Sequence, residues 1–313
     1  MRKPVFTVAL TLTAVVSLSA CGGGSDPLAA EGGGSGDDAN AIIVGGANFP
    51  ESETVANIYA EVLRANGFDV DTTLDIGSRE AYIPALRDGS IDVIPDYTGN
   101  LLQYLVPGTT AVTAEDVDAA LPAALAPDLE IATPAPAEDK DAVVVTAETA
   151  QKWNLKTIAD LAAHSEEVAF GAPAEFQERP VGLPGLSAKY GLNISPDRFV
   201  PIADGGGPAT VDALVSGQIT AANIFTTSPA IVEEGLVVLG DPDNNFPAQN
   251  VVPVLRADKK SPKLIEVLDT VSAKLTTEEL TDLNVEVSGD AKTEPDEAAR
   301  SWVEAQGLGE PIG

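Results

Sequence analysis

The sequence has very little of the residue types that build metal sites, disulfides and hydrolytic triads. Its 313 residues include one cysteine, Cys21, and one histidine, His164. A single cysteine cannot form an intrachain disulfide, and one cysteine with one histidine cannot complete a zinc site of the Cys/His type. His164 lies in a polar stretch and is predicted to be a solvated residue at a helix end. We therefore expect no metal, no cofactor and no catalytic residue.

Basic residues are also scarce. The chain has 18 Lys and Arg and 48 Asp and Glu, which gives a formal net charge of −30 at pH 7. A chain this negative repels nucleic-acid phosphates, so we expect no nucleic-acid partner. Aromatic residues make up only 5% of the chain, yet hydrophobic residues reach 44%, which is enough for a substantial core. The length is typical of roughly two domains.

Apolar runs long enough to span a bilayer are missing beyond the amino terminus, so we do not expect a channel or a permease. Arg2 and Lys3 precede an uncharged apolar run over residues 4–20, the pattern of a secretory signal. Residues 18–21 read Leu-Ser-Ala-Cys and resemble the bacterial lipobox. That resemblance implies a signal peptide over residues 1–20 and lipidation of Cys21. An ordinary signal peptide followed by a chance cysteine is the alternative.

The segment after Cys21 contains almost nothing that packs. Residues 22–40 hold seven glycines together with Ser, Asp and Glu. A flexible tether of this length spans roughly 25 Å. We therefore predict that residues 21–41 are the lipidated cysteine and a tether that holds a globular domain at the outer face of the cytoplasmic membrane.

From residue 42 onward, strand and helix patterns alternate, which is typical of a parallel α/β sheet. In the first part of the chain the expected strands are 42–44, 69–76 and 91–94, with helices over 50–66 and 81–87. A second alternating series follows residues 142–146 and ends with an apolar run over 250–255. The remaining segment is predicted to be mostly helical, with Trp302 in the core.

Two segments share the pattern Ala-Leu-x-x-Gly-x-Ile, residues 85–91 and 213–219. At the same offset, the first is followed by Tyr97-Thr98 and the second by Phe225-Thr226. Each unit is typical of a helix, a tight glycine turn and a strand, and ligands of open α/β sheets bind beyond the carboxyl ends of the strands. We therefore predict that the two units face each other across a cleft. Chance likeness of two common turns is the alternative.

An ordered set of motifs runs through the chain between about residues 42 and 308. The motifs are Gly77-Ser78-Arg79-Glu80, Asp92-x-x-Pro95-Asp96-Tyr97-Thr98-Gly99, Phe176-x-x-Arg179, Gly182-Leu183-Pro184-Gly185-Leu186, Phe246-Pro247-x-x-Asn250-x-x-Pro253-Val254 and Leu275-Thr276-x-x-x-Leu280-x-x-Leu283-Asn284. In this set the chain resembles the substrate-binding proteins of bacterial ABC transporters for glycine betaine, choline, carnitine and related osmoprotectants.

This resemblance implies an α/β type II periplasmic-binding-protein fold, with two lobes joined by two crossover strands that close around a small ligand. We place the crossovers at residues 142–146 and 250–255. Lobe I is then expected over residues 42–144 and 251–313, and lobe II over 145–250. The implied partners are a small zwitterionic or cationic solute and the permease and ATPase subunits of an ABC importer. A monomer is expected.

The resemblance also implies ligand-binding residues. Tyr97 matches one tyrosine of the family's aromatic box, and Arg179 matches its carboxylate-binding arginine. Phe225, Gln249 and Asp141 stand where the family has its other box tyrosines. Aromatic faces hold quaternary ammonium groups with ~0.5–2 kcal/mol each. Because only two aromatic walls remain, we predict a more polar pocket, suited to a ligand with hydrogen-bond donors.

Four further residues and one loop are assigned to the same cleft. Asn100 stands where the family commonly has threonine, and Thr226 follows the second aromatic residue. Asn48 precedes a helix start and is predicted to meet an anion, with a capping role as the alternative. The loop 204–208 is either an anion nest or a flexible turn. Glu80 either meets a ligand cation or forms a surface salt bridge.

The interpretation that joins these observations is a lipid-anchored receptor that delivers a compatible solute, such as glycine betaine or a related quaternary amine, to a permease. The alternatives are a receptor for another zwitterion or a polyol, including ergothioneine-like compounds, and a ligand-sensing lipoprotein without transport. An enzyme on the same fold would use Glu80, Asp96 and Asp141 as acids. The sequence offers no base or metal cluster beside them, so we expect a protein that is not an enzyme.

Overall fold

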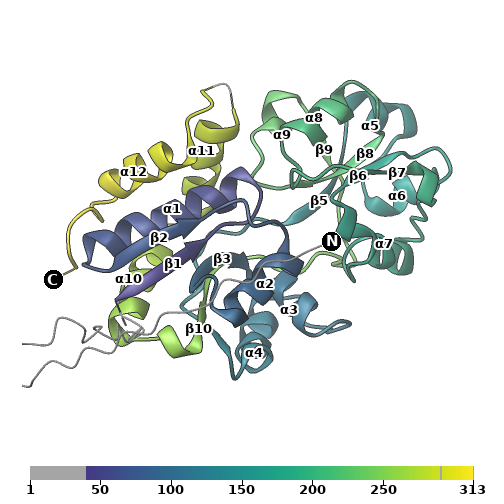
Figure 1. Cartoon of the computed structure of the whole chain (residues 1–313). Coiled ribbons are helices and arrows are strands. Elements are labelled where there is room, and N and C mark those ends of the chain that lie inside the picture. The colour runs from purple at the N-terminus through teal and green to yellow at the C-terminus, as the bar shows by residue number, and fades with distance from the viewer. Residues whose placement is uncertain (1–39, 290, 313) are drawn as a thin grey trace, which may run out of the picture. The chain divides into compact units, whose positions relative to one another are not determined.

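The structure, a computed structural model, describes residues 40–289 and 291–312. The predicted signal peptide, Cys21 and nearly all of the predicted tether lie outside the described residues. Residues 39–313 form a unit with its own internal contacts. This unit contains two five-stranded sheets, each with helices packed on it (Figure 1). We call the elements on the first sheet lobe I and those on the second sheet lobe II.

The sheet of lobe I has the strand order β2-β1-β3-β10-β4. Its strands are β1 (Ala41–Gly45), β2 (Asp69–Thr73), β3 (Val93–Tyr97), β4 (Leu129–Ile131) and β10 (Val251–Arg256). β1 pairs in parallel with β2 and β3, whereas β10 runs antiparallel to β3 and β4.

The sheet of lobe II has the order β7-β6-β8-β5-β9. Its strands are β5 (Asp141–Val145), β6 (Phe170–Ala172), β7 (Phe199–Pro201), β8 (Ala221–Phe225) and β9 (Val237–Val238). β6 is parallel to β7 and β8, and β5 is antiparallel to β8 and β9. The expectation of parallel sheets is therefore corrected to mixed sheets. The reason is that β5 and β10 each enter from the other lobe, without the crossover helix that a parallel neighbour requires.

The chain passes between the lobes twice, through residues 132–140 and 239–250. The two connections lie side by side, because Asp139 N–H donates to the Gln249 carbonyl at 3.0 Å and Ala135 N–H donates to the Val251 carbonyl at 2.8 Å. The expected boundary at residue 144 falls inside β5, whose five residues all belong to the second sheet. The expected boundary at residue 251 coincides with the start of β10.

Helices cover both sheets. Lobe I carries α1 (Pro50–Ala65), α2 (Arg79–Asp88), α3 (Thr98–Leu105), α4 (Ala114–Leu125), α10 (Pro262–Lys274), α11 (Thr277–Ser288) and α12 (Pro295–Ala305), with the 3-10 helix η3 (Ala257–Lys259). Lobe II carries α5 (Ala147–Trp153), α6 (Ile158–Ala162), α7 (Leu183–Tyr190), α8 (Pro208–Val215) and α9 (Ala230–Glu233), with η1 (Ala174–Gln177) and η2 (Pro196–Arg198). The predicted helices thus form within a few residues of their expected ends.

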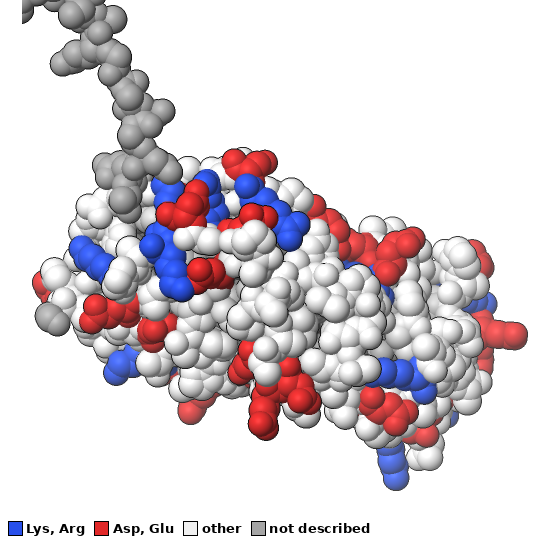
Figure 2. Space-filling model, turned by 90° about the horizontal axis from the view of Figure 1, so that it is seen from below, with Lys and Arg blue, Asp and Glu red and all other residues white. Residues whose placement is uncertain are grey.

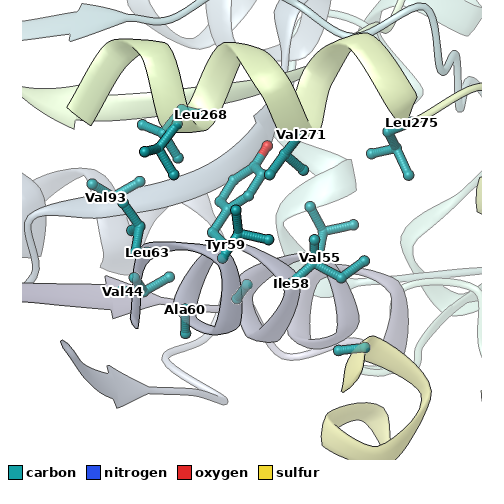
Figure 3. Packing of buried hydrophobic residues seen from close by; sticks show 14 of the residues in the cluster. Val44, Val55, Ile58, Tyr59, Ala60, Leu63, Val93, Leu268, Val271 and Leu275 are labelled. Carbon is teal, nitrogen blue, oxygen red and sulfur yellow. The ribbon is translucent and has the colours of Figure 1, made fainter. Parts of the chain in front are cut away.

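The core of lobe I is built around α1. This helix begins with Pro50 and has acidic residues in its first turn, which suit a helix amino terminus. Figure 3 shows Tyr59 and Leu63 of α1 near Leu268 and Val271 of α10, all of them buried. Trp302 lies in the same cluster, as predicted. The carboxyl-terminal helices therefore complete the core that the first part of the chain begins.

The two Ala-Leu-x-x-Gly-x-Ile segments adopt the same local structure. Gly89 and Gly217 both have positive φ, at 84° and 75°, and end α2 and α8 in the same tight turn. The strands that follow end at Tyr97 and Phe225, whose rings stack with centroids 6.3 Å apart and planes inclined by 12°. The prediction that these two units face each other is confirmed.

Figure 2 shows acidic side chains in several groups on one face, with Lys and Arg between them. Within the described ranges, no helix combines the length and the apolar character needed to cross a membrane.

Candidate functional site

A cavity of about 150 Å³ lies between the two lobes. Its lobe I wall consists of Ala47, Asn48, Phe49, Ser52, Ser78, Arg79, Tyr82, Pro95, Tyr97 and Asn100. The opposite wall consists of Asp139, Asp141, Pro173, Glu175, Phe176, Arg179, Ala203, Gly205, Asn223 and Phe225. Six of the nine predicted ligand-binding residues are among them: Asn48, Tyr97, Asn100, Asp141, Arg179 and Phe225.

Three aromatic rings form a continuous wall of this cavity. Phe49 lies 6.1 Å from Tyr97 and 5.7 Å from Phe225, measured between ring centroids. Phe49 comes from the residue before α1, Tyr97 from the end of β3 and Phe225 from the end of β8. Phe49 was not predicted from the sequence, in which its only signal is its place between Asn48 and the helix start at Pro50. The wall is therefore assembled from both lobes.

The loop 204–208 supports this wall. Gly205 has φ 61°, and a Cβ atom there would lie 3.1 Å from Cβ of Phe49. Glycine thus allows both the turn and the close approach of the ring. The Asp204 carboxylate accepts hydrogen bonds from the N–H and the hydroxyl of Thr210, in the first turn of α8, at 3.1 and 2.5 Å. The loop therefore packs lobe II against Phe49.

Behind the aromatic wall lies a buried carboxyl group, Glu51. It accepts hydrogen bonds from the Tyr97 hydroxyl at 2.5 Å, the Thr227 hydroxyl at 2.8 Å and the Asn284 amide at 2.5 Å. Burial raises the pKa of Glu51 and outweighs the three donors. Glu51 was not predicted as a site residue from the sequence, because its partners lie on β3, after β8 and on α11.

A second buried acid, Asp139, lies in the first connection between the lobes. Its Oδ1 accepts a hydrogen bond from the Thr227 N–H at 3.1 Å, whereas its Oδ2 has no hydrogen-bond partner. Burial, together with the charge of Glu51, raises the pKa of Asp139 well above its ordinary value. Two buried carboxyl groups, those of Glu51 and Asp139, thus lie between the lobes.

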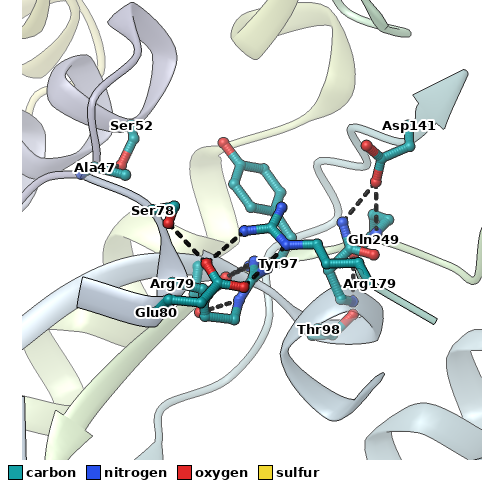
Figure 4. Close-up of polar contacts among 12 residues, drawn as sticks. Ala47, Ser52, Ser78, Arg79, Glu80, Tyr97, Thr98, Asp141, Arg179 and Gln249 are labelled. Atoms are coloured by element: carbon teal, nitrogen blue, oxygen red, sulfur yellow. Dashed lines mark hydrogen bonds and ion pairs between the residues drawn. The ribbon is translucent and has the colours of Figure 1, made fainter. Parts of the chain in front are cut away.

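The two arginines in the cavity wall are paired differently. Arg79 makes a bidentate pair with Asp96, at 2.5 and 3.2 Å, and both side chains are buried within lobe I. Arg179 of lobe II reaches Glu80 of lobe I at 2.9 and 3.2 Å and also contacts Glu175 at 3.4 Å (Figure 4). The Arg79 pair is internal to lobe I, and the Arg179 pair joins the lobes.

Glu80 does not line the cavity itself but holds the Arg179 guanidinium at its edge. Burial raises the pKa of the Glu80 carboxyl, but the hydrogen bonds and charge of Arg179 outweigh burial and lower the pKa to about 2. Glu80 is therefore ionised at neutral pH. Of the two alternatives for Glu80, the structure contains the salt bridge.

Polar residues on the other side of the cavity also join the lobes. The Asn100 amide on α3 donates to Asp141 at the start of β5, at 2.5 Å. The Gln249 amide donates to the same carboxylate at 3.4 Å, as Figure 4 shows. Gln249 is fully buried and accepts a hydrogen bond from the Asn100 N–H at 3.0 Å. Gln249 thus positions Asn100 and Asp141 without lining the cavity.

The side chains of the two remaining predicted residues, Asn48 and Thr226, form hydrogen bonds with backbone atoms. The Asn48 amide donates to the Ala203 carbonyl of lobe II at 3.4 Å, and Phe49 rather than Asn48 is the N-cap of α1. Thr226 is exposed and does not line the cavity. Its hydroxyl accepts from the Lys140 N–H at 3.0 Å, which ties the end of β8 to the first connection. In the described part of the chain, no group of three or more His, Cys, Asp or Glu is arranged to hold a metal ion.

Comparisons with known proteins agree with this architecture. Residues 40–305 match the family described as the substrate binding domain of ABC-type glycine betaine transport systems. The chain is 26% identical over 262 residues to the glycine betaine-binding protein YehZ of Escherichia coli (strain K12), covering 80% of this chain and 86% of that protein. It is 31% identical over 168 residues to the ergothioneine transport permease/ergothioneine binding protein EgtU of Helicobacter pylori (strain G27), covering 53% of this chain and 29% of that protein.

A solved structure of a glycine betaine/carnitine/choline ABC transporter protein superposes with a TM-score of 0.66 at 21% identity, covering 86% of this chain and all of that one. At this identity the likeness supports the fold, which is the predicted two-lobed α/β fold of periplasmic binding proteins. The family match extends over both lobes and every residue of the cavity wall. The chain therefore belongs to the family of substrate-binding domains of ABC-type glycine betaine transport systems, the receptor proteins of ABC importers.

Proposed function

We propose that this receptor binds a small quaternary amine, glycine betaine or a related compatible solute, in the cavity between the lobes. The observation that carries the proposal is the aromatic wall of Phe49, Tyr97 and Phe225. A quaternary ammonium group has no N–H donors, so a protein holds it with aromatic faces. Because the wall needs both lobes, a ligand bound on it stabilises the closed arrangement, which the permease recognises.

The geometry of the wall determines how such a ligand binds. A cation–π contact needs the cation over a ring face and within about 6 Å of its centroid. Tyr97 and Phe225 are nearly parallel with centroids 6.3 Å apart, so no trimethylammonium group fits between them. The ligand therefore lies against the wall rather than inside a cage. The carboxylate of Asp141, which lines the opposite side, adds a negative field that favours a cationic head group.

The larger cavity between the lobes, of about 340 Å³, shares Phe49, Gly205 and Phe225 with the first one. It contains neither arginine and only one of the predicted ligand-binding residues, Phe225. We therefore place the solute in the smaller cavity, where both arginines, the aromatic wall and the polar residues meet.

We further propose that Cys21 is lipidated and anchors the receptor, as a monomer, at the outer face of the cytoplasmic membrane beside its permease and ATPase subunits. The lipobox-like residues 18–21 and the glycine-rich segment after them support this proposal. Fractionation of cells that express Cys21→Ser tests it. The variant is expected to leave the membrane fraction, and retention of lipid label in the variant contradicts the anchor.

A second ligand class, ergothioneine-like zwitterions, is favoured by the pairing of Asn100 with Asp141 in the wall, which suits a ligand with hydrogen-bond donors. The similarity to the ergothioneine binding protein points the same way. Titration calorimetry of residues 39–313 with glycine betaine, choline and ergothioneine tests the two classes. Saturable binding of a betaine or choline supports the first proposal, and binding of ergothioneine alone replaces it with the second.

A further inference from the structure

The Arg179 guanidinium is held from across the gap between the lobes. Arg179 follows η1 in lobe II, and Glu80 lies in the first turn of α2 in lobe I. Nη2 to Oε2 is 2.9 Å and Nε to Oε1 is 3.2 Å, so one carboxylate occupies one edge of the guanidinium in the bidentate manner. The Ser78 hydroxyl donates to Glu80 Oε2 at 2.7 Å and fixes the carboxylate in this position.

A ligand carboxylate would bind the same Nε/Nη2 edge of the Arg179 guanidinium. Carboxylates bind guanidinium groups with two parallel N–H···O bonds. In this cavity the other arginine, Arg79, is committed to Asp96, and these side chains are 6% and 0% exposed. The Arg179 and Glu80 side chains are 23% and 43% exposed. A ligand carboxylate that enters the cavity therefore cannot reach the buried Arg79 guanidinium. It can bind the Arg179 guanidinium only by displacing the partly exposed Glu80 side chain.

The remaining charges act in the same direction. Glu175 also contacts Arg179, at 3.4 Å, so two carboxylates offset one guanidinium. Asp141 also lines the cavity, and its carboxylate accepts hydrogen bonds from the Asn100 and Gln249 amides, which carry no positive charge. The wall as a whole thus favours a positive ligand and disfavours an additional carboxylate.

We propose that Glu80 is a specificity-determining residue that occupies, on Arg179, the position of a ligand carboxylate, so that the receptor favours a quaternary amine without a carboxylate over a zwitterionic one. This inference rests on the proposed function and names the ligand class within it. Glu80 acts as an internal competitor, and a zwitterion binds only by displacing it. The residue also bridges the lobes, and the experiment must separate these two roles.

Choline and glycine betaine form a matched pair of probes, because both carry a trimethylammonium group and only glycine betaine carries a carboxylate. We would titrate both into wild type, Glu80→Gln and Glu178→Gln of residues 39–313. Glu178→Gln is the control, since this exposed side chain lies next to Arg179 in the chain, whereas the Arg179 guanidinium pairs with Glu80 and Glu175. Thermal unfolding of each protein checks that it is folded.

Wild type is expected to bind choline more tightly than glycine betaine. Glu80→Gln is expected to raise the affinity for glycine betaine about fivefold, which is the scale of a partly exposed ion pair. Its affinity for choline is expected to stay within about twofold of the wild-type value. Glu178→Gln is expected to behave as wild type. The ratio of the two affinities therefore reports the competition alone.

Three results overturn the inference. A wild type that prefers glycine betaine shows that Glu80 does not exclude a carboxylate. Equal weakening of both probes in Glu80→Gln shows that the residue only bridges the lobes, and the proposed function stands. Absence of binding of both probes to every folded protein shows instead that the proposed quaternary-amine function is wrong, and the inference falls with it.

Discussion

The hydroxyl of Tyr97 donates a hydrogen bond of 2.5 Å to the buried carboxyl group of Glu51. This bond holds the polar end of the tyrosine against Glu51, which does not line the smaller cavity, whereas Tyr97 itself does. The same carboxyl group accepts a hydrogen bond from Thr227 of lobe II. One buried acid thus orients the aromatic wall and joins the lobes behind it.

Replacing Tyr97 by phenylalanine is therefore expected to separate stability from binding. The variant leaves Glu51 without one donor, which costs about 1–3 kcal/mol of unfolding free energy. The ring face remains, so affinity for a quaternary amine is expected to stay within about twofold, whereas Tyr97→Ala loses it. Denaturant unfolding and calorimetry measure the two quantities. A large loss of affinity in Tyr97→Phe would show that the hydroxyl contacts the ligand.

Phe49, which only the structure identifies, gives a second test of the aromatic wall. Phe49→Leu keeps an apolar side chain but removes the ring face. The variant is expected to bind a quaternary amine with an affinity about two- to thirtyfold lower than that of wild type. Phe68→Leu, at a buried position in the core of lobe I, is the matched control and is expected to keep the affinity. Equal affinities in the two variants would remove Phe49 from the site.

The buried acids Glu51 and Asp139 predict an unusual dependence of stability on pH. Both have pKa values raised by burial above their ordinary values of 4.5 and 3.8. At these two sites the folded protein therefore binds more protons than the unfolded chain, so their contribution to stability is fully present below the ordinary pKa values and is lost as pH rises through the raised ones. Asp141, on the other side of Asp139, adds a like charge.

Asp139→Asn is expected to flatten this fall and to raise stability at neutral pH by about 1 kcal/mol. The amide keeps an acceptor for the Thr227 N–H and removes one of the two charges that burial disfavours. Chemical unfolding at pH 5, 6, 7 and 8 measures the slope. An unchanged slope would mean that Asp139 does not take up a proton in the folded protein.

The ion pair of Arg79 with Asp96 is predicted to be structural. Asp96→Asn leaves the Arg79 guanidinium buried without its counter-charge, which is expected to cost about 3–5 kcal/mol. Asp296→Asn, which breaks the exposed pair with Arg300, is the control and is expected to cost less than about 1 kcal/mol. Similar losses in the two variants, measured by urea unfolding, would contradict the buried role.

Many residues of the candidate site were predictable from motifs, but the contacts that each side chain makes were not. Tyr97, Phe225 and Arg179 line the cavity as expected. Gln249 and Thr226, which were also expected to meet the ligand, do not line the cavity, and their contacts position Asn100 and the end of β8. Sequence spacing predicts roughly where a residue lies in the fold, whereas the orientation of its side chain depends on the helices and strands packed around it.

By itself, the sequence determined the order of helices and strands, because hydrophobic periodicity, helix-start residues and glycine turns act over a few neighbouring residues. It also determined that Tyr97 and Phe225 end equivalent units. Only the tertiary structure decided that β5 and β10 run antiparallel to their neighbours, that Phe49 completes the aromatic wall and that Glu51 lies behind it. The pairing of Glu80 with Arg179 joins residues 99 positions apart, and the packing of the two lobes brings them together.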